Sequence, residues 1–327
     1  MLSCDTRVES WEMREPFEIS REIITDQKVL WVSLSDSQGH TGVAEAAGVD
    51  YDGETPASMA AQIAAVQDQL NDGVDGATLL RLLPAGGARN ALDCALWDLR
   101  AKQSGVPVWQ AAALAPLLPV TTAFTLGLGD EATTRRKARE AREFPLLKLK
   151  VDALRHLDVV RWVREEHPQA RLVVDANQAW SLDLLKELLP QLAQAGVELV
   201  EQPLACGSDA LLDGLQSPIP LAADESCTDR HSLAALQGRY QFINIKLDKC
   251  GGLTEALAMA DEATRLGMGL MVGNMCGTSL AMAPAFLIAQ RCRYVDLDGP
   301  LLQKQDRPTP LIYRQGVVQV PPAALWG

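Results

Sequence analysis

From about residue 118 onward, short apolar runs alternate with stretches that are apolar on one side and polar on the other. The stretches 131–143 and 181–196 have the spacing of amphipathic helices. Strands that alternate with helices predict parallel βαβ units. Eight strands in about 180 residues favour a closed (β/α)8 TIM barrel over an open sheet. The predicted strands are 120–128, 146–151, 171–177, 197–203, 220–226, 242–248, 269–274 and 293–298.

The N-terminal part of the chain has a different pattern, which predicts an α+β domain. Residues 28–47 have the pattern of two strands joined at a glycine-containing turn, and 57–70 and 88–105 have the pattern of helices. Gly105 followed by Pro107 is typical of a helix end. The expected parts are a capping domain at 1–115, a barrel at 116–299, and a tail at 300–327 that packs back on the capping domain.

Acidic residues stand at the ends of three successive predicted strands. Asp175, Glu201 and Asp224 follow apolar runs, and active sites of such barrels lie where the strands end. Three carboxylates in one pocket repel each other unless a cation joins them, and oxygen ligands suit magnesium. Each acid alone fits a strand-end cap or a surface ion pair, but three at matching ends favour a metal site.

Two lysines, Lys148 and Lys150, interrupt the apolar run 146–151 and face the same side of the predicted strand. Lys246 lies in the sixth predicted strand, which lies opposite the second across a barrel. A neutral lysine can remove a proton from carbon, and a charged one can return it. We expect Lys148 to lower the pKa of Lys150. The alternative is that these lysines only form structural salt bridges with the acids.

Composition narrows the possible functions. The net charge of −12 and a pI of about 4.9 argue against a nucleic-acid partner. No apolar run approaches the roughly 20 residues that span a bilayer, and the first residues lack the apolar core of a signal peptide, so we expect a cytoplasmic protein without a membrane partner. The seven irregularly spaced cysteines fit a reducing compartment rather than a disulfide framework or a zinc site.

Several short motifs stand in order along the chain: "ARNALDCALWDL" (88–99), "KLK" (148–150), "VVDANQAW" (173–180), "VEQP" (200–203), "ADES" (223–226) and "INIKLDKCGG" (243–252). In their order and spacing, these motifs resemble the enolase superfamily in its muconate-lactonizing-enzyme subgroup. Within the subgroup, "LPAGGARNALDCALWDL", "GRYQFINIKLDKCGGLTEALA" and "DLDGP" resemble the dipeptide epimerases of the L-Ala-D/L-Glu type.

The resemblance implies a role for each matching residue in the barrel. Asp175, Glu201 and Asp224 would hold Mg²⁺, the expected cofactor. Lys150 and Lys246 would be the acid/base catalysts on opposite faces of the substrate α-carbon, in line with enolase-type sites that combine a lysine base with magnesium.

Asp296 and Asp298 match the Asp-x-Asp motif with which dipeptide epimerases hold the substrate ammonium group. Independently of the resemblance, two carboxylates two residues apart at a strand end share a face and can bind a cation. The alternative is that they only cap a turn before Gly299. Lys148 is expected to lie against the substrate as well.

Substrate choice depends on the capping domain, where Arg21 is a candidate substrate-binding residue or a structural ion-pair partner. The family can place an arginine slightly later in this loop to face a glutamate side chain. Here Ile23 and Ile24 occupy those positions, which departs from the glutamate-binding pattern and leaves room for an apolar side chain.

The sequence therefore predicts a magnesium-dependent dipeptide epimerase, an isomerase that moves the α-proton of the C-terminal residue, with L-Ala-D/L-Glu as the first candidate substrate. The alternatives are epimerisation of other, apolar dipeptides, an o-succinylbenzoate synthase or cycloisomerase of the same subgroup, and a catalytically silent barrel. The expected partner is a small dipeptide, and a homo-oligomer is compatible with the sequence. A place in cell-wall peptide metabolism follows only from the resemblance.

Overall fold

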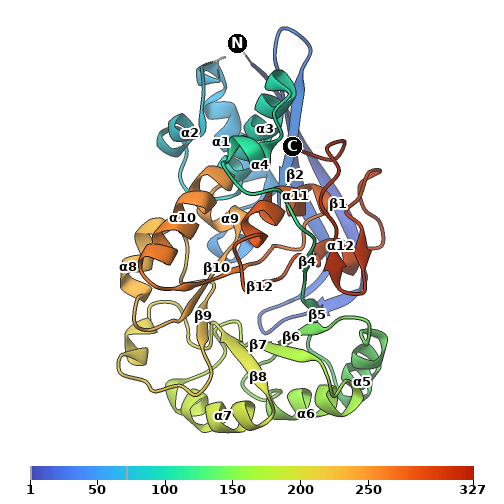
Figure 1. The fold of residues 1–327 in the computed structure, drawn as a ribbon, viewed down its shortest axis with the longest axis vertical. Helices are drawn as coiled ribbons and strands as arrows, with labels where there is room; N and C mark the ends of the chain where they lie inside the picture. The colour runs from blue at the N-terminus through green and yellow to red at the C-terminus, as the bar shows by residue number, and fades with distance from the viewer. Residues whose placement is uncertain (1, 71–72) are drawn as a thin grey trace.

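The structure is a computed structural model that describes residues 2–70 and 73–327. Its N-terminal part is an antiparallel sheet of order β1-β2-β3 with helices packed on one face (Figure 1). The longest of these helices approaches the sheet closely at Gly42, where a Cβ atom would lie 2.2 Å from the Ala95 carbonyl oxygen. The elements are β1 (Ser3–Glu18), β2 (Ile23–Ser35), β3 (Thr41–Ala46), α1 (Pro56–Ala65), α2 (Gly76–Leu82), α3 (Gly87–Ser104) and α4 (Val108–Ala111).

The second part is a curled sheet of eight parallel strands in the order β12-β11-β10-β9-β8-β7-β6-β5. The Ala123 amide donates to the Val295 carbonyl oxygen at 2.7 Å and joins the two edges. The predicted barrel fold with an N-terminal α+β part is therefore confirmed. The strands are β5 (Phe124–Leu126), β6 (Leu146–Lys150), β7 (Arg171–Asp175), β8 (Val197–Glu201), β9 (Leu221–Ala223), β10 (Phe242–Ile245), β11 (Gly269–Val272) and β12 (Tyr294–Val295).

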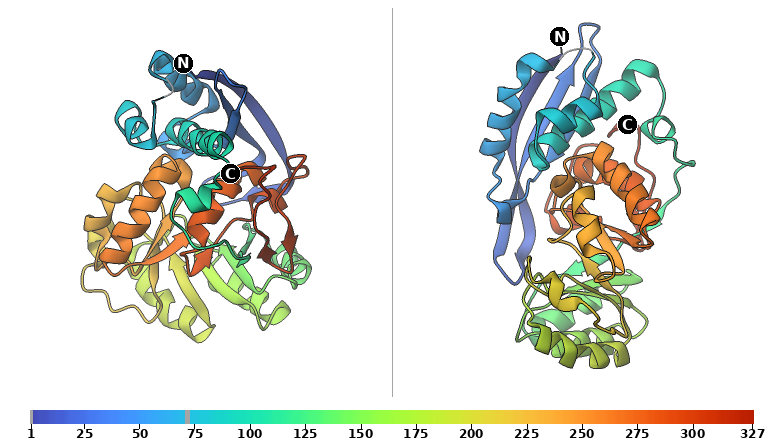
Figure 2. Two further views of the ribbon diagram at one scale, coloured as in Figure 1. Left: turned by 45° about the horizontal axis from the view of Figure 1, so that its top comes forward. Right: turned by 90° about the vertical axis from the view of Figure 1, so that its left-hand side faces the viewer.

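Helices cover the outside of the barrel (Figure 2). In α7 (Leu182–Gln194), the Ser181 side chain accepts the Leu184 amide at the N-cap, and buried leucines recur at helical spacing at 185, 188, 189 and 192. The other helices are α5 (Glu131–Glu140), α6 (Leu157–Glu166), α8 (Leu233–Leu236), α9 (Leu247–Cys250), α10 (Leu253–Arg265), α11 (Ser279–Ala289) and α12 (Gly299–Leu302).

The inward-facing positions of the barrel separate an apolar floor from a charged layer. Because side chains alternate along a strand, each residue of the floor is followed two positions later by another inward-facing residue. On β6 this order is Leu146, Lys148 and Lys150, all buried. The floor takes one buried apolar residue from each strand or its immediate neighbour: Ala123, Leu146, Val173, Leu199, Ala222, Phe242, Met271 and Tyr294.

The predicted strand 120–128 is two strands, because its two pieces belong to different sheets. Between them, the Thr122 hydroxyl accepts the Leu297 amide at 2.9 Å. Its first piece, β4 (Val120–Thr121), pairs with the tail through β14 (Val317–Val318), which in turn pairs with β13 (Tyr313–Arg314).

The end of the tail reaches α3, where Trp326 Nε1 donates to the Cys94 carbonyl oxygen at 3.0 Å. The domain limits at 115 and 299 stay predictions. Among the described residues, no helix has the length and apolar character needed to cross a membrane.

Candidate active site

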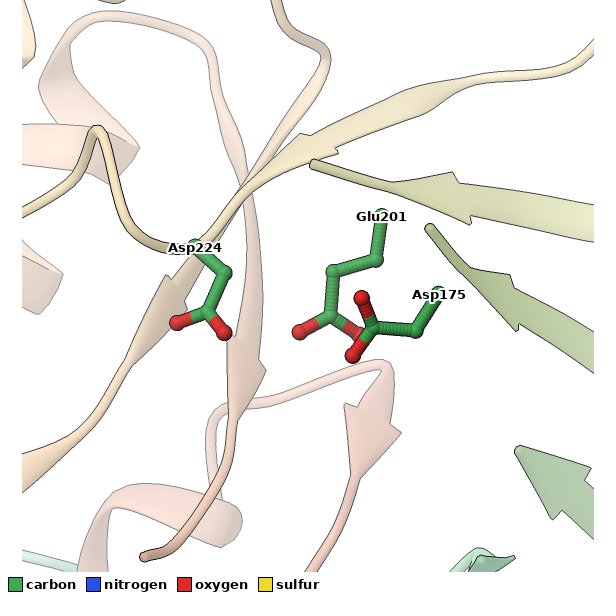
Figure 3. A group of neighbouring side chains, drawn as sticks. All are labelled: Asp175, Glu201 and Asp224. Carbon is green, nitrogen blue, oxygen red and sulfur yellow. The ribbon is translucent and has the colours of Figure 1, made fainter. Parts of the chain in front are cut away.

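Three carboxylates meet inside the barrel at the ends of adjacent strands (Figure 3). Asp175 ends β7, Glu201 ends β8 and Asp224 follows β9, and each is at most 1% exposed. One oxygen from each lies within 4.8 Å of the others. Burial, together with the charges of Asp175 and Asp224, raises the pKa of Glu201 to about 8 despite the nearby Lys148. A cation would relieve this repulsion, and three oxygen ligands fit Mg²⁺.

Lys148 lies under this cluster and is fully buried. Its Nζ is 2.8 Å from Glu201 Oε2, 2.9 Å from Asp296 Oδ2 and 3.0 Å from Asp175 Oδ2. Burial lowers the pKa of Lys148, but the charges of Asp296, Glu201 and Asp175 outweigh burial and hold it well above its usual value. Lys148 is therefore a positively charged counter-ion of the cluster, and its expected effect on the Lys150 pKa stays a prediction.

Lys150 and Lys246 line one cavity of about 90 Å³. The Nζ of Lys150 lies 2.7 Å from Asp175 Oδ2, and the Nζ of Lys246 lies 2.8 Å from Asp224 Oδ2. Burial lowers the pKa of Lys246, but Asp224 outweighs it and raises that pKa. Since β6 and β10 are four strands apart in the sheet, the two amines can reach a bound molecule from opposite sides.

Asp296 and Asp298 are 5% and 1% exposed and lie beside the cluster. Asp296 bonds to Lys148, and the Thr125 amide donates to Asp298 Oδ2 at 2.6 Å. Burial and the neighbouring Asp296 raise the pKa of Asp298 to about 8. The structure brings the two aspartates together, but the cavity with Lys150 is lined by other residues.

Arg21 reaches the cavity from the loop between β1 and β2. Its Nη1 lies 2.8 Å from Glu225 Oε1, and its guanidinium lies 4.8 Å from the centre of the Tyr51 ring. The Asn177 side-chain amide also donates to Glu225 Oε1, at 3.2 Å. The sequence predicted no role for Glu225, Tyr51 or Asn177, although Asn177 and Glu225 stand within two residues of predicted metal ligands.

The sequence reasoning also missed Lys249 and Asn244. The Nζ of Lys249 lies 2.6 Å from Asp224 Oδ1, and Asn244 Nδ2 donates to Glu201 Oε1 at 2.8 Å. Strand alternation could have found Asn244, because it stands two positions before Lys246 and so shares its inward face. Lys249 lies in α9, where strand alternation does not apply.

Two family models match the chain and together cover most of it. Residues 1–111 match the mandelate racemase/muconate lactonizing enzyme N-terminal domain, and residues 130–324 match the enolase C-terminal domain-like family. The chain belongs to the mandelate racemase/muconate lactonizing enzyme family. This membership agrees with the two-part fold, because the two matched ranges correspond to the N-terminal part and the barrel.

Named relatives cover most of the chain. An L-Ala-D/L-Glu epimerase of Escherichia coli is 42% identical over 89% of this chain and 91% of its own. An N-acetyl-D-glutamate racemase of Pseudoalteromonas is 44% identical over 76% of this chain and 79% of its own. The crystal structure of an Agrobacterium tumefaciens enolase family member with homology to dipeptide epimerases, solved with sodium and L-Ala-L-Glu, has a TM-score of 0.97 and 40% identity over the whole of both chains.

Proposed function

We propose that the protein is a magnesium-dependent epimerase that inverts the α-carbon of the C-terminal residue of a dipeptide. The observation that carries this proposal is that Lys150 and Lys246 line the same cavity from distant strands, each bonded to a carboxylate of the buried cluster. Two amines on opposite sides of a carbon atom are what inversion by proton transfer requires. The names of the epimerase and racemase relatives support the same reaction class.

Asp175, Glu201 and Asp224 would hold the magnesium ion, which supplies positive charge to the substrate carboxylate as the α-proton leaves. One lysine, in its neutral form, takes the proton on its Nζ, and the opposite lysine, as an ammonium group, gives a proton to the other face. Lys148 holds the carboxylates together through its three ion pairs. The low exposure of Lys150 and Lys246, 8% and 7%, excludes most water from the two amines.

L-Ala-D/L-Glu is the reference substrate, because the Escherichia coli relative is named for it. In this assignment Asp296 and Asp298 face the substrate ammonium group, with Lys148 and Arg21 among the residues around the substrate. We place the reaction in the cytoplasm and in cell-wall peptide metabolism as part of the same proposal.

The test is incubation of the protein with Mg²⁺ and an L,L-dipeptide library in D₂O, followed by mass spectrometry and chiral separation. Deuterium at the α-carbon of the C-terminal residue, together with the inverted stereoisomer, is the expected result. Loss of both signals after chelation ties the reaction to the metal. A protein that exchanges no α-proton in any dipeptide with Mg²⁺ present does not have this function.

A second candidate is racemisation of an N-acylated amino acid, which has no free ammonium group. Asp298 is bonded to the Thr125 amide and Asp296 to Lys148, so neither aspartate depends on a substrate cation for a partner. One relative is named N-acetyl-D-glutamate racemase. The comparison of N-acetyl-L-glutamate with L-Ala-L-Glu in the same exchange assay decides between the two, because only a dipeptide epimerase favours the free ammonium group.

A further inference from the structure

We propose that the cavity receives the side chain of the residue being epimerised, and that its wall selects a side chain ending in a positively charged donor, such as lysine. The inference rests on the proposed function and names the substrate class within it. The wall is formed by the loops around Arg21 and Tyr51 and by Asn177 and Glu225 at the barrel.

Glu225 presents a buried acceptor without a partner to this cavity. Arg21 Nη1 and Asn177 Nδ2 both bond to Glu225 Oε1, at 2.8 Å and 3.2 Å. Glu225 Oε2 has no hydrogen-bond partner among the residues that the structure describes, although the side chain is only 1% exposed. A buried carboxylate oxygen without a donor is unfavourable, so a donor on the substrate gains more here than at an exposed site.

Asn177 adds a second acceptor of the same kind. Its Nδ2 donates to Glu225, while its Oδ1 is buried and has no partner within residues 2–70 and 73–327. The backbone of Asn177 is left-handed with φ 42°, and the Ser20 hydroxyl donates to its carbonyl oxygen at 3.2 Å. Two fixed acceptors on the cavity wall fit an ammonium group, which has three donors and no acceptor.

The charges around the cavity favour the same occupant. Seven charged residues line the cavity: Arg21, Lys150 and Lys246 are cationic, and Glu22, Asp50, Asp224 and Glu225 are acidic. Lys150 and Lys246 are paired with Asp175 and Asp224, which leaves the positive charge of Arg21 beside the three negative charges of Glu22, Asp50 and Glu225. Arg21 is already paired with Glu225, and burial together with Asp50 raises the pKa of Glu22. A glutamate side chain would add another negative charge to this wall, whereas a lysine side chain would offset one.

The rest of the wall suits the methylene stem of a lysine side chain. Phe17, Ile19 and Ile24 line the cavity, and the first two are 7% and 8% exposed. Long cationic side chains lay their apolar stems against such surfaces and keep the charged end among polar groups. An apolar side chain would use this surface too, but it would leave the acceptors of Glu225 and Asn177 without donors.

The experiment compares kcat/KM for α-proton exchange among L-Ala-L-Lys, L-Ala-L-Gln, L-Ala-L-Leu and L-Ala-L-Glu with Mg²⁺ in D₂O. We expect L-Ala-L-Lys to exceed L-Ala-L-Glu by at least about tenfold, since unlike and like charges at this wall act in opposite directions. Equal or faster exchange of L-Ala-L-Glu overturns the inference and leaves the epimerase function standing. Exchange in none of the four would instead overturn the proposed function.

Two variants test whether the acidic residues of the cavity wall cause the preference for L-Ala-L-Lys over L-Ala-L-Glu. Glu225→Gln keeps the shape of the side chain and removes its charge, so the ratio of kcat/KM for L-Ala-L-Lys over L-Ala-L-Glu should fall about tenfold, mainly through KM for the lysine dipeptide. The double variant Glu22→Gln/Asp50→Asn, which lies further from the metal ligands, should lower the same ratio.

Glu262→Gln, on the outer helix α10, is the matched control and should leave the ratio unchanged. If Glu225→Gln is inactive on all four dipeptides, the double variant alone decides. A ratio that stays constant in the active variants contradicts the assignment.

Discussion

Lys148 and Lys150 contact the same atom, because Oδ2 of Asp175 lies 3.0 Å from the Nζ of Lys148 and 2.7 Å from the Nζ of Lys150. Two ammonium groups on one strand face repel, and one carboxylate oxygen between them offsets that repulsion. Burial raises the pKa of Asp175, but Lys150 and Lys148 outweigh it and hold that pKa below its usual value. The proposed proton carrier is thereby linked to the proposed metal site through a single side chain.

Replacing either cavity lysine should separate the two halves of the reaction. In Lys150→Ala, net epimerisation should fall by about 10²–10⁴-fold, the range for loss of an acid/base group. The remaining lysine should still exchange the α-proton of one stereoisomer with D₂O. Lys246→Ala should retain exchange of the opposite stereoisomer. Exchange is measured by NMR from each pure stereoisomer.

The control for both variants is Lys186→Ala, an exposed lysine on α7. It should exchange both stereoisomers at the rate of the unaltered protein. Normal epimerisation by Lys150→Ala would show that the two-base scheme is wrong.

Magnesium should stabilise the protein as well as support its activity. At a concentration of 100 Kd, a ligand that binds only the folded state adds about 2.7 kcal/mol to the free energy of unfolding. Asp224→Asn should lose this increment, and thermal unfolding with Mg²⁺ and with chelator measures it within each variant. Asp213→Asn, at an exposed ion pair with Arg239, should keep the increment. An equal increment in both variants would refute the metal assignment of Asp224.

Gly273 should be required for the position of Lys246. It follows β11, and a Cβ atom there would lie 2.8 Å from the Asn244 amide and 3.0 Å from Lys246 Cε. Gly273→Ala should therefore lower kcat by about tenfold or more, since small displacements of a catalytic group are costly. Gly129→Ala is the control, because the atoms nearest to its Cβ would belong to the Thr133 and Thr134 side chains, at 3.1 Å or more. Steady-state kinetics and thermal unfolding of both variants test this.

Stability should depend on pH through Asp93, which joins α3 to α10. Its oxygens accept the Thr254 amide at 2.8 Å and contact the Thr254 hydroxyl at 2.6 Å, and burial raises its pKa to about 6. Because the folded-state pKa is raised, the neutral acid favours folding below the unfolded-state pKa of about 3.9, and this contribution is lost as pH rises through 6.

Asp93→Asn should remove this dependence. Relative to that variant, the free energy of unfolding of the unaltered protein should fall by about 3 kcal/mol between about pH 4 and pH 8. Urea unfolding at a series of pH values measures the difference. The control is Asp158→Asn, at an exposed position on α6. The difference in free energy of unfolding between this variant and the unaltered protein should not change with pH. A flat difference for Asp93→Asn as well would mean that burial does not shift its pKa.

The barrel could be predicted from the sequence because each strand is a short apolar run followed by a charged group. Runs such as 146–151 and 171–177 place Lys150 and Asp175 at the same end of the sheet. By contrast, β1 was not predicted, because most of its side chains are exposed and many are charged. It is held by its ladder to β2 and by a few buried residues such as Met13 and Phe17.

Contacts between residues that are far apart in the sequence could not be predicted either. Arg21 and Glu225 are 204 residues apart, and no local pattern indicates that the β1–β2 loop bends over the end of β9. The sequence reasoning left open whether Lys148 acts on Lys150 or pairs with the acids, and it could not say which acids. In the structure three carboxylates from other strands surround its Nζ. Spacing along one strand shows which face a residue occupies, but it does not show what stands opposite.

The capping sheet and the barrel contribute separate parts of the cavity wall. Arg21 and Glu22 stand on the β1–β2 loop of the N-terminal part, and Asp50 and Tyr51 on the short 3-10 helix η1 (Asp50–Asp52) that follows β3. Lys150 and Lys246 belong to the barrel. In evolution, mutations in these N-terminal segments can change the accepted side chain while the residues that move the proton stay in place. Related enzymes can therefore come to accept different substrates through changes at the edge of the site, without changes to the residues that carry out the reaction.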